Sequence, residues 1–332
     1  MSEKDPVFIV GCGRSGTTLL RVMLAGSERL MIPPECDFLW RAARRFGTTA
    51  RMTGRHEEFI ELLGGISSFP ALELSADDLR DELKRQSGDT IAGCIETVYR
   101  VYARLHGRSR WGDKNPFYVR YLPLITRLFP TCRVIHMVRD GRDVAVSLRN
   151  TKMRPHNLFL TARRWERCVE AGRKWGAEHP EQYLEVRYER LVDNPEQELR
   201  RVCEFIDEPF SPAMLDYHKV NRDLRQVAPA ERGHHGNLAK PVMRGNTEKW
   251  RSALTPQDQQ IVETVAGRTL AAAGYARVQS SVPLWLKAYL RSCELRYGLG
   301  ASPLVHRLLD AAPWRVRVMT RKALLIDNEH YR

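Results

Sequence analysis

Residues 7–20 read VFIVGCGRSGTTLL and predict a strand, a glycine-rich loop and the first turns of a helix. The four apolar residues 7–10 are typical of a buried strand, and the apolar residues after Thr17 suit a helix. Three glycines within residues 11–16 let the backbone turn tightly because they have no Cβ. A helix N-terminus directs N–H groups and the positive end of its dipole at one point. The stretch therefore predicts a phosphate-binding loop.

The loop differs at one position from the phosphate loop of nucleotide triphosphatases. That loop has the pattern G-x-x-x-x-G-K-[ST], in which the lysine reaches the β- and γ-phosphates. Here the frame from Gly11 to Gly16 continues with Thr17 and Thr18, so a threonine stands at the lysine position. The cation lies inside the loop, at Arg14. We therefore expect a single 5′-phosphate held by the threonines and the amides, with Arg14 directed at the bond that breaks.

The composition is that of a globular chain with an excess of basic residues. The 332 residues are 43% hydrophobic and 28% charged, enough for one large domain or two small ones. A net charge of +13 favours acidic partners, namely phosphorylated or sulfated cofactors, nucleic acid or an anionic membrane surface. The first strand follows the start of the sequence at once, and no run of 18 apolar residues occurs. We therefore expect neither a leader nor a membrane span.

The seven cysteines carry no signal of pairing or of metal binding. Their number is odd, neighbouring cysteines are at least 24 positions apart, and no C-x-x-C pair occurs. Neither a disulfide framework nor a zinc site is therefore expected. A reducing cytoplasm is the expected location.

Two more strands are predicted, at residues 133–138 and 182–187. Strands that alternate with helices indicate a parallel sheet covered on both faces. The loops that follow the strands of such a sheet meet at its carboxyl edge. The loops at 11–17, 139–147 and 188–191 should therefore converge on one crevice.

The rest of the chain is predicted to be mainly helical. The expected helices cover residues 36–46, 56–64, 75–105, 118–129, 144–152, 157–178, 195–206, 255–273, 283–298 and 303–326. Residues 111–117, which read WGDKNPF, are interpreted as a polar loop. Residues 221–250 have no clear period and are interpreted as a long functional loop.

The loop after the second predicted strand offers a second anion site. Arg139 ends the strand, and Ser147 follows eight residues later on the next predicted helix. An arginine fork and a hydroxyl can hold a phosphate that is separate from the first. Asp140 and Asp143 are expected to orient the arginines and to cap the helix. Two phosphate sites indicate a nucleotide that is phosphorylated at two places.

These residues resemble the signatures of the sulfotransferases that use 3′-phosphoadenosine 5′-phosphosulfate. Residues 13–20, GRSGTTLL, match the loop for the 5′-phosphosulfate, and residues 138–142, VRDGR, together with Ser147 match the segment for the 3′-phosphate. A loop that contains an arginine resembles the loop of the tyrosylprotein sulfotransferase branch and its bacterial relatives. The resemblance implies an α/β fold, a P-loop three-layer α/β/α arrangement with a central parallel sheet, helical insertions and a helical C-terminal extension.

Two further matches concern the reacting groups. Glu35, directly after Pro34, falls where that branch keeps its catalytic glutamate. Residues 113–117, DKNPF, resemble the family segment whose lysine, here Lys114, contacts the transferring group.

Later matches concern the cofactor. Tyr188 begins a Tyr-Glu-x-Leu segment whose tyrosine lies near the adenine in the family. Lys240, and then Lys249 with Trp250, resemble the late loop that closes over the cofactor. The resemblance covers residues 1–275, and the shared order of the motifs makes it specific.

The resemblance implies transfer of a sulfuryl group to a hydroxyl acceptor, which leaves adenosine 3′,5′-bisphosphate. Such a transfer runs in line through a loose transition state, so catalysis is mainly positioning and charge stabilisation. Arg14 and Lys114 would neutralise oxygens, and Glu35 would take the acceptor proton. The group carries a single negative charge, so no metal is expected. The implied cofactor-binding residues are Gly13, Arg14, Ser15, Gly16, Thr17, Thr18, Arg139, Ser147, Tyr188, Lys240, Lys249 and Trp250.

Several alternatives stay open. His234 and His235 are rival bases, because imidazole titrates near neutral pH. A P-loop kinase for a small molecule is a rival enzyme, which Thr17 and the second phosphate site disfavour. A basic binder of nucleic acid or of a membrane surface is a rival without catalysis, although the aromatic interleaving of a single-strand binder is not evident and no nucleic acid is expected. Peptide tyrosine, a glycan, a lipid and a small molecule are all open as acceptors.

Residues 281–332 lie outside the resemblance. We expect a sulfotransferase domain over 1–280 and a basic amphipathic helical extension over 281–332, with nine basic and four acidic side chains and a net charge of +5. Its apolar side is expected to pack against the domain or against a second subunit of a homodimer. Peripheral contact with a membrane or with an acidic partner is the alternative.

Overall fold

A computed structural model of the chain describes residues 5–85, 89–149, 157–220, 236–243, 245–278 and 281–300, with isolated positions beyond residue 300. It divides into two compact units, the first made of Met1–Arg139 and Ala171–Thr247 and the second of Asp140–Glu170 and Glu248–Arg332. The division therefore falls inside helix α8 (Leu158–Glu178). The boundary expected after residue 280 is a different division and stays a prediction.

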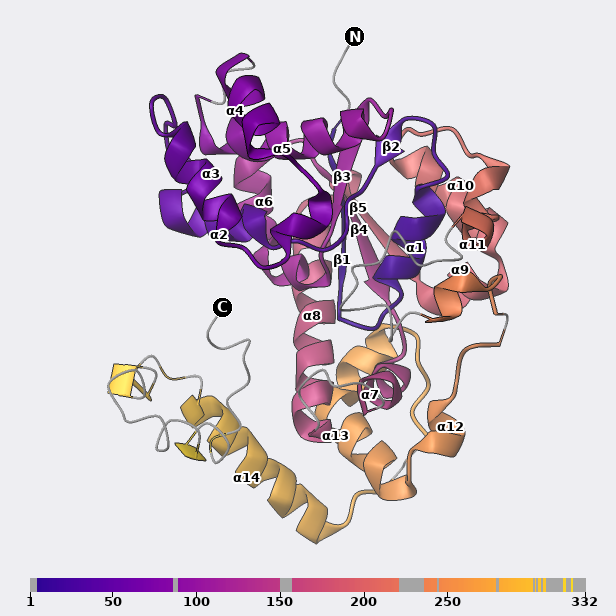
Figure 1. Cartoon of the computed structure of the whole chain (residues 1–332). Helices are drawn as coiled ribbons and strands as arrows, with labels where there is room; N and C mark the ends of the chain where they lie inside the picture. The colour runs from indigo at the N-terminus through magenta and orange to yellow at the C-terminus, as the bar shows by residue number, and fades with distance from the viewer. Residues whose placement is uncertain are drawn as a thin grey trace. The chain divides into compact units, whose positions relative to one another are not determined.

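The first unit is built on a five-stranded parallel sheet with the strand order β2-β3-β1-β4-β5 (Figure 1). The strands are β1 (Val7–Gly11), β2 (Leu30–Met31), β3 (Arg110–Lys114), β4 (Arg133–Val138) and β5 (Tyr183–Arg187). In the register, Val7 of β1 lies opposite Gly112 of β3 and Arg133 of β4. The parallel sheet and three of its strands are as predicted.

Strand β1 is apolar on both faces because helices cover both faces of the sheet. Val7 and Ile9 share a buried cluster with Leu20, whereas Phe8 on the opposite face lies 5.9 Å, between ring centroids, from Trp111. In Figure 1 helices α1, α9 and α10 cover one face, and α5 and α6 cover the other. These helices span Thr17–Leu24, Tyr188–Asp193, Pro195–Phe205, Ile91–Leu105 and Leu122–Leu128, respectively. The expected three-layer α/β/α arrangement is therefore confirmed.

A helical insertion separates β2 from β3. It consists of α2 (Phe38–Phe46), α3 (His56–Gly64), the 3₁₀ helix η1 (Phe69–Leu72), α4 (Ala76–Arg85) and α5. The helix expected over 75–105 is thus two helices, α4 and α5. Among the described residues, the first unit also contains the short helices η2 (Pro116–Tyr121), η3 (Pro180–Gln182), η4 (Pro212–Met214), α11 (Tyr217–Val220) and η6 (Gly236–Ala239).

The interpretation of residues 111–117 as a polar loop is wrong for its first part. Residues Arg110–Lys114 form β3, which pairs with both β1 and β2. Arg110, Asp113 and Lys114 are all buried in this strand. Each has a partner far away in the sequence, and such partners are not visible in the local pattern of hydrophobicity.

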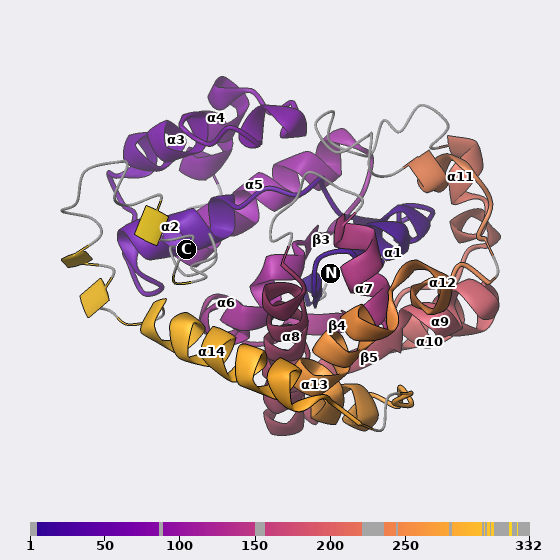
Figure 2. The ribbon, with the colours of Figure 1, turned by 90° about the horizontal axis from the view of Figure 1, so that it is seen from below.

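The second unit is helical. It contains α7 (Gly141–Arg149), the first part of α8, α12 (Trp250–Ala253), α13 (Pro256–Ala272) and α14 (Leu284–Gly300). Helix α13 begins with a capping box, in which Thr255 and Asp258 exchange hydrogen bonds between side chain and backbone. Figure 2 shows α14 running beside α13 and α8. The helices expected over 157–178, 255–273 and 283–298 are confirmed, whereas most of 303–326 lies outside the described residues.

Within the part of the chain that the structure describes, no helix is both long enough and apolar enough to cross a membrane.

Candidate active site

The loop between β1 and α1 has a backbone that suits an anion. Gly16 caps α1 with a φ of 93°, and Arg14 also has a positive φ, of 73°. A Cβ on Gly16 would lie 2.5 Å from Cδ2 of Tyr188, so no other residue fits there without a shift. Helix α1 begins at Thr17, and the N–H groups of a first helical turn have no partner inside the helix. The loop therefore supplies the donors and the dipole that a phosphate needs.

Ser15 gives a direct test of whether the loop fits a ligand. Its backbone N–H donates to the carbonyl of Cys12 at 3.1 Å and closes the turn. Its hydroxyl is buried and has no hydrogen-bond partner among the described residues. A buried hydroxyl without a partner costs free energy. A phosphate oxygen in the loop would satisfy this hydroxyl, so the residues present fit a phosphorylated cofactor.

Lys114 brings together residues that the sequence places far apart. It ends β3, opposite Ile9 of the neighbouring β1, and so emerges beside the loop. Its ammonium group donates to Oγ1 of Thr18 at 3.3 Å and forms an ion pair with the carboxylate of Glu35. The side chain of Lys114 is 1% exposed and that of Glu35 is 30% exposed. A buried cation and a partly open carboxylate therefore lie beside the N-terminus of α1.

The position of Glu35 follows from the chain on either side of it. It comes between the end of β2 and the start of α2, directly after Pro33 and Pro34. Proline fixes its own φ and restricts the residue before it, so this segment has few alternative conformations. The segment between β2 and α2 therefore holds the carboxylate of Glu35 near Lys114, although Glu35 is in neither a helix nor a strand.

Asp113 supports the site from the opposite face of β3. The hydroxyl of Tyr99 donates to its carboxylate, and the ring of Tyr99 stacks on Trp111 at 4.5 Å between centroids. Burial raises the pKa of Asp113 to about 7, although Tyr99 and Lys114 both favour the charged form. Burial also raises the pKa of Tyr99 well above its ordinary value. This packing fixes the strand that carries Lys114.

Arg139 and Tyr188 meet at the same edge of the sheet. Arg139 follows β4 and Tyr188 follows β5, and the guanidinium carbon lies 4.2 Å from the centre of the tyrosine ring. The guanidinium group donates to the carbonyl of Arg14 and to that of Asn246, both at 3.3 Å. The ends of β1, β4 and β5 therefore converge, as the sequence predicts for parallel strands.

Asn246 is a residue of this site that the sequence analysis missed. Its side-chain amide donates to the hydroxyl of Tyr188 at 2.7 Å, and its carbonyl accepts from Arg139. Its side-chain oxygen is buried without a partner among the described residues. Asn246 lies inside the long segment 221–250, where the sequence has no period or motif that singles it out.

Three of the predicted cofactor residues are not among the contacts described above. Lys240 lies in the first unit with an exposed side chain, and its carbonyl accepts from the hydroxyl of Tyr217 at 2.9 Å. Ser147 is half-buried on α7, and Lys249 is exposed beside α12, both in the second unit. The cofactor contacts of these three residues stay predictions. The rival bases His234 and His235 lie outside the described residues.

Trp250 is a buried residue of the second unit. Its ring lies 3.7 Å from the guanidinium carbon of Arg142 and 4.6 Å from that of Arg251. Its backbone N–H donates to Asp143 at 2.9 Å. Arg142 is in turn ion-paired with Asp140 and Glu263. These contacts give Trp250 a place in the core of this unit, and its expected role at the cofactor stays a prediction.

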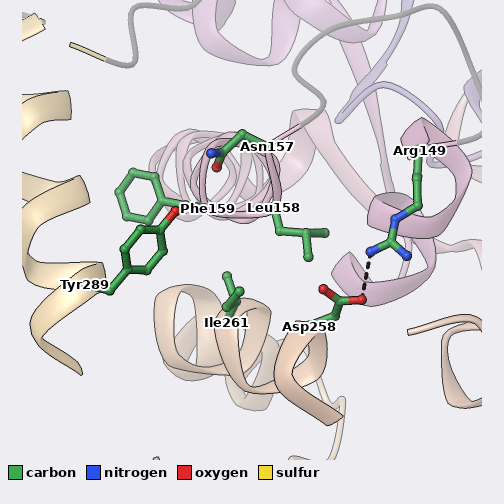
Figure 3. Close-up of a pocket in the computed structure, with 7 residues that line it drawn as sticks. All are labelled: Arg149, Asn157, Leu158, Phe159, Asp258, Ile261 and Tyr289. Atoms are coloured by element: carbon green, nitrogen blue, oxygen red, sulfur yellow. Dashed lines mark hydrogen bonds and ion pairs between the residues drawn. The ribbon is translucent and has the colours of Figure 1, made fainter. Parts of the chain in front are cut away.

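The second unit also contains a pocket of about 320 Å³ between its helices (Figure 3). Arg149 and Asp258 form an ion pair at 2.9 Å at one end, and Asn157 and Tyr289 lie at the other. The apolar side chains of Leu158, Phe159 and Ile261 complete the lining. None of the residues predicted for the reaction lines this pocket.

Metal ligands were not expected from the sequence. Among the described residues, no group of three His, Cys, Asp or Glu side chains is placed to hold a metal ion. That the reaction needs no metal stays a prediction.

Comparison with known proteins decides the family. The profile of the Sulfotransferase family matches residues 6–212, a range that contains the glycine loop, Glu35, Lys114 and Arg139. The chain belongs to the sulfotransferase family. The tyrosylprotein branch of this family is represented by protein-tyrosine sulfotransferase 1 of Danio rerio, which is 27% identical over 278 residues, covering 81% of this chain and 72% of that protein.

Two other proteins are also similar to this chain. An uncharacterized protein of Aquifex aeolicus is 26% identical over 266 residues, which are 76% of this chain and 32% of that protein. This sulfotransferase-family chain therefore matches about a third of that relative's length. The sulfotransferase domain of the Synechococcus PCC 7002 olefin synthase has a similar structure, with a TM-score of 0.57 at 25% identity, covering 85% of this chain and 98% of that domain.

Proposed function

We propose that this chain transfers a sulfuryl group from 3′-phosphoadenosine 5′-phosphosulfate to a hydroxyl acceptor, without a metal. The observation that carries the proposal is the position of Lys114. Its ammonium group contacts Thr18 of the glycine loop on one side and Glu35 on the other. A single buried cation thus joins the predicted phosphate site to the predicted base.

The glycine loop and Arg139, which we propose hold the donor, follow strands β1 and β4 at the carboxyl edge of the sheet. The amides of residues 13–18 and the buried hydroxyl of Ser15 would hold the 5′-phosphate. Arg139, which lies on the ring of Tyr188, would hold the 3′-phosphate, and Ser147 would complete that site. When bound, the donor supplies an activated sulfuryl group and leaves as adenosine 3′,5′-bisphosphate.

Glu35 is the proposed general base. Its ion pair with Lys114 holds the carboxylate in place, and its 30% exposure leaves room for an acceptor hydroxyl. Glu35 then takes the proton of that hydroxyl as the oxygen attacks. Lys114 and Arg14 neutralise the negative charge that the oxygens carry. For Lys114 this needs no rearrangement, because its contacts with Thr18 and Glu35 already hold it.

The first acceptor to test is a tyrosine-containing peptide, because relatives such as the Danio rerio protein are named protein-tyrosine sulfotransferases. Glycans, lipids and small hydroxylated molecules complete the set of acceptors. We also propose a cytoplasmic location, which the seven free cysteines support.

Thermal shift measurements test the donor assignment. Adenosine 3′,5′-bisphosphate should raise the melting temperature without metal, since a ligand at about 100 times its dissociation constant stabilises by about 2.7 kcal/mol. A rise with magnesium-ATP alone would indicate the rival kinase, and a rise with an oligonucleotide alone would indicate the rival binder. Either result overturns the proposal.

Substitutions of two arginines, one at each end of β4, test which residue holds the 3′-phosphate. Arg139→Ala should weaken adenosine 3′,5′-bisphosphate far more than adenosine 5′-phosphate, because only the first ligand has the second phosphate. Arg133→Ala is the matched control, since Arg133 begins the same strand at the other edge of the sheet. Equal weakening of both ligands by Arg139→Ala would refute the assignment.

A further inference from the structure

Helix α14 has apolar residues on two faces. Leu286, Leu290 and Cys293 are buried, and they pack with Phe159 and Leu160 of α8. This face accounts for the attachment of α14 to the second unit (Figure 2). A helix with one such face normally turns polar residues to the solvent.

The outer face of α14 is apolar as well. Leu284, Leu295 and Leu299 are 83%, 67% and 58% exposed. At 100° per residue these three leucines fall within about 60° of one another around the helix, so they form one stripe. Trp285, which borders the stripe, is 57% exposed. Several exposed leucines on one side of a helix are typical of a site of interaction.

The charged residues that border the stripe directly are basic. The structure describes α14 throughout, and its basic residues are Lys287, Arg291 and Arg296. Lys287 and Arg291 are exposed and border the leucine stripe on the side opposite Trp285. Glu294 is the acidic residue of the helix, and it forms an ion pair with Arg163 of α8. The solvent-facing side of α14 therefore combines leucines, a tryptophan and positive charge.

We propose that α14 docks on an anionic membrane surface. Its leucine stripe would enter the boundary of the acyl chains, while Lys287 and Arg291 contact the lipid phosphates. An amphipathic helix with leucine and tryptophan on one side and basic residues beside them lies in the plane of the membrane interface. Each basic residue near an anionic bilayer adds attraction, and the net charge of +13 on the chain adds more.

The other occupants fit the surface less well. A second copy of this chain would bring two positively charged patches together, because a two-fold interface is formed by the same patch of both subunits. An acidic protein would pair with the basic residues of α14, but its acidic side chains would not cover the exposed leucine stripe. A lipid surface offers both phosphates and apolar depth. The proposal does not depend on the reaction proposed above.

Vesicle flotation of the full chain tests the docking surface. The chain should float with vesicles that contain phosphatidylserine and not with vesicles of phosphatidylcholine alone, and high salt should release it. The double variant Lys287→Glu/Arg291→Glu should bind the anionic vesicles at least about tenfold more weakly. Leu295→Ser/Leu299→Ser should weaken binding by a similar factor at unchanged net charge.

A matched control separates docking from general attraction. Arg127→Glu/Lys174→Glu changes the net charge by the same amount at exposed positions of α6 and α8, and it should alter binding by no more than about twofold. Thermal melting of each variant checks that it is folded. The proposal is overturned if the wild-type chain ignores anionic vesicles, or if the control weakens binding as much as the α14 variants. It is also overturned if sedimentation shows a dimer that the leucine variant dissociates.

Discussion

The two ends of strand β3 each bury a cation beside a carboxylate, and the two pairs differ in how open they are. At one end the side chains of Arg110 and Glu208 are 6% and 0% exposed. At the other end Lys114 is 1% exposed, but Glu35 is 30% exposed. The strand therefore carries one closed pair and one pair with an open side.

The closed pair of Arg110 and Glu208 is a structural joint, meaning that it links β3 to other segments of the first unit. Arg110 also donates to the backbone carbonyls of Asp5 and Ile206, while Ser27 donates to Glu208. These partners of Arg110 are all groups of the protein itself. A ligand could therefore reach Arg110 only by breaking these contacts. The open pair instead leaves its carboxylate accessible from outside. The two pairs differ in the accessibility of the carboxylate and not in the burial of the cation, so this accessibility is what would distinguish the pair proposed to react from the supporting pair.

The largest effect is expected on turnover at the open end. Glu35→Gln should lower turnover by ~10²–10⁴ and leave the thermal shift with adenosine 3′,5′-bisphosphate nearly intact, because the amide keeps the shape but cannot take a proton. Transfer from labelled donor measures it. Asp37→Asn, two residues away and paired with Arg41, is the control that should stay active. Unchanged turnover in Glu35→Gln would move the role of base to His234, His235 or the acceptor.

The next effect is expected on stability at the closed end. Arg110→Leu should lower the free energy of unfolding by about 3 kcal/mol, because it leaves the carboxylate of Glu208 buried without its main partner. Urea denaturation measures the loss. Arg133→Leu, at a pair whose side chains are 33% and 34% exposed, should cost less than about 1 kcal/mol. If both variants lose the same amount, the pair of Arg110 and Glu208 is not a joint.

Asp113, between the two ends, should make stability depend on pH. Burial raises its pKa to about 7 from an ordinary value of 3.8, so the folded chain binds this proton more tightly than the unfolded chain. Its contribution to stability is therefore greatest below about pH 4 and falls as the pH rises to about 7. Urea denaturation should show Asp113→Asn gaining about 2 kcal/mol relative to the wild type between about pH 5 and pH 7. Parallel stability curves for the two proteins would contradict this.

The smallest effect is expected on stability at the open end of β3, and it compares the two ends of the strand directly. Lys114→Met should lower the free energy of unfolding by only about 1 kcal/mol, because the 30% exposed carboxylate of Glu35 can turn to water. The same urea measurement that is used for Arg110→Leu gives the value. A loss as large as that of Arg110→Leu would mean that both ends of β3 are structural, and the distinction between them would fail.

The glycine loop and the Arg139 segment could be predicted because their signals are local. A buried strand, glycines and a helix start follow one another within residues 7–20, and Arg139 directly ends an apolar strand. The convergence of these segments also follows from a rule, since the ends of parallel strands share an edge.

Strand β3 could not be predicted in the same way. Its five residues read RWGDK, and the polar side chains make this sequence look like a loop. The strand is stabilised by partners of these polar side chains that lie far away in the sequence. Asn246 was missed for the same reason, since its contacts with Arg139 and Tyr188 arise only in the folded chain. Long-range pairing of buried polar groups leaves no mark on the local sequence.

The close approach of Gly16 to the ring of Tyr188 has a consequence for the order of folding. An atom of the ring lies 2.5 Å from where a Cβ of residue 16 would be, so the loop packs against a side chain that the ribosome adds much later. Domains fold as units while the chain is being synthesised. A nascent chain that ends before β5 therefore has the loop sequence but lacks the surface that sets its form. Nucleotide binding should appear only when the last strand of the sheet has joined.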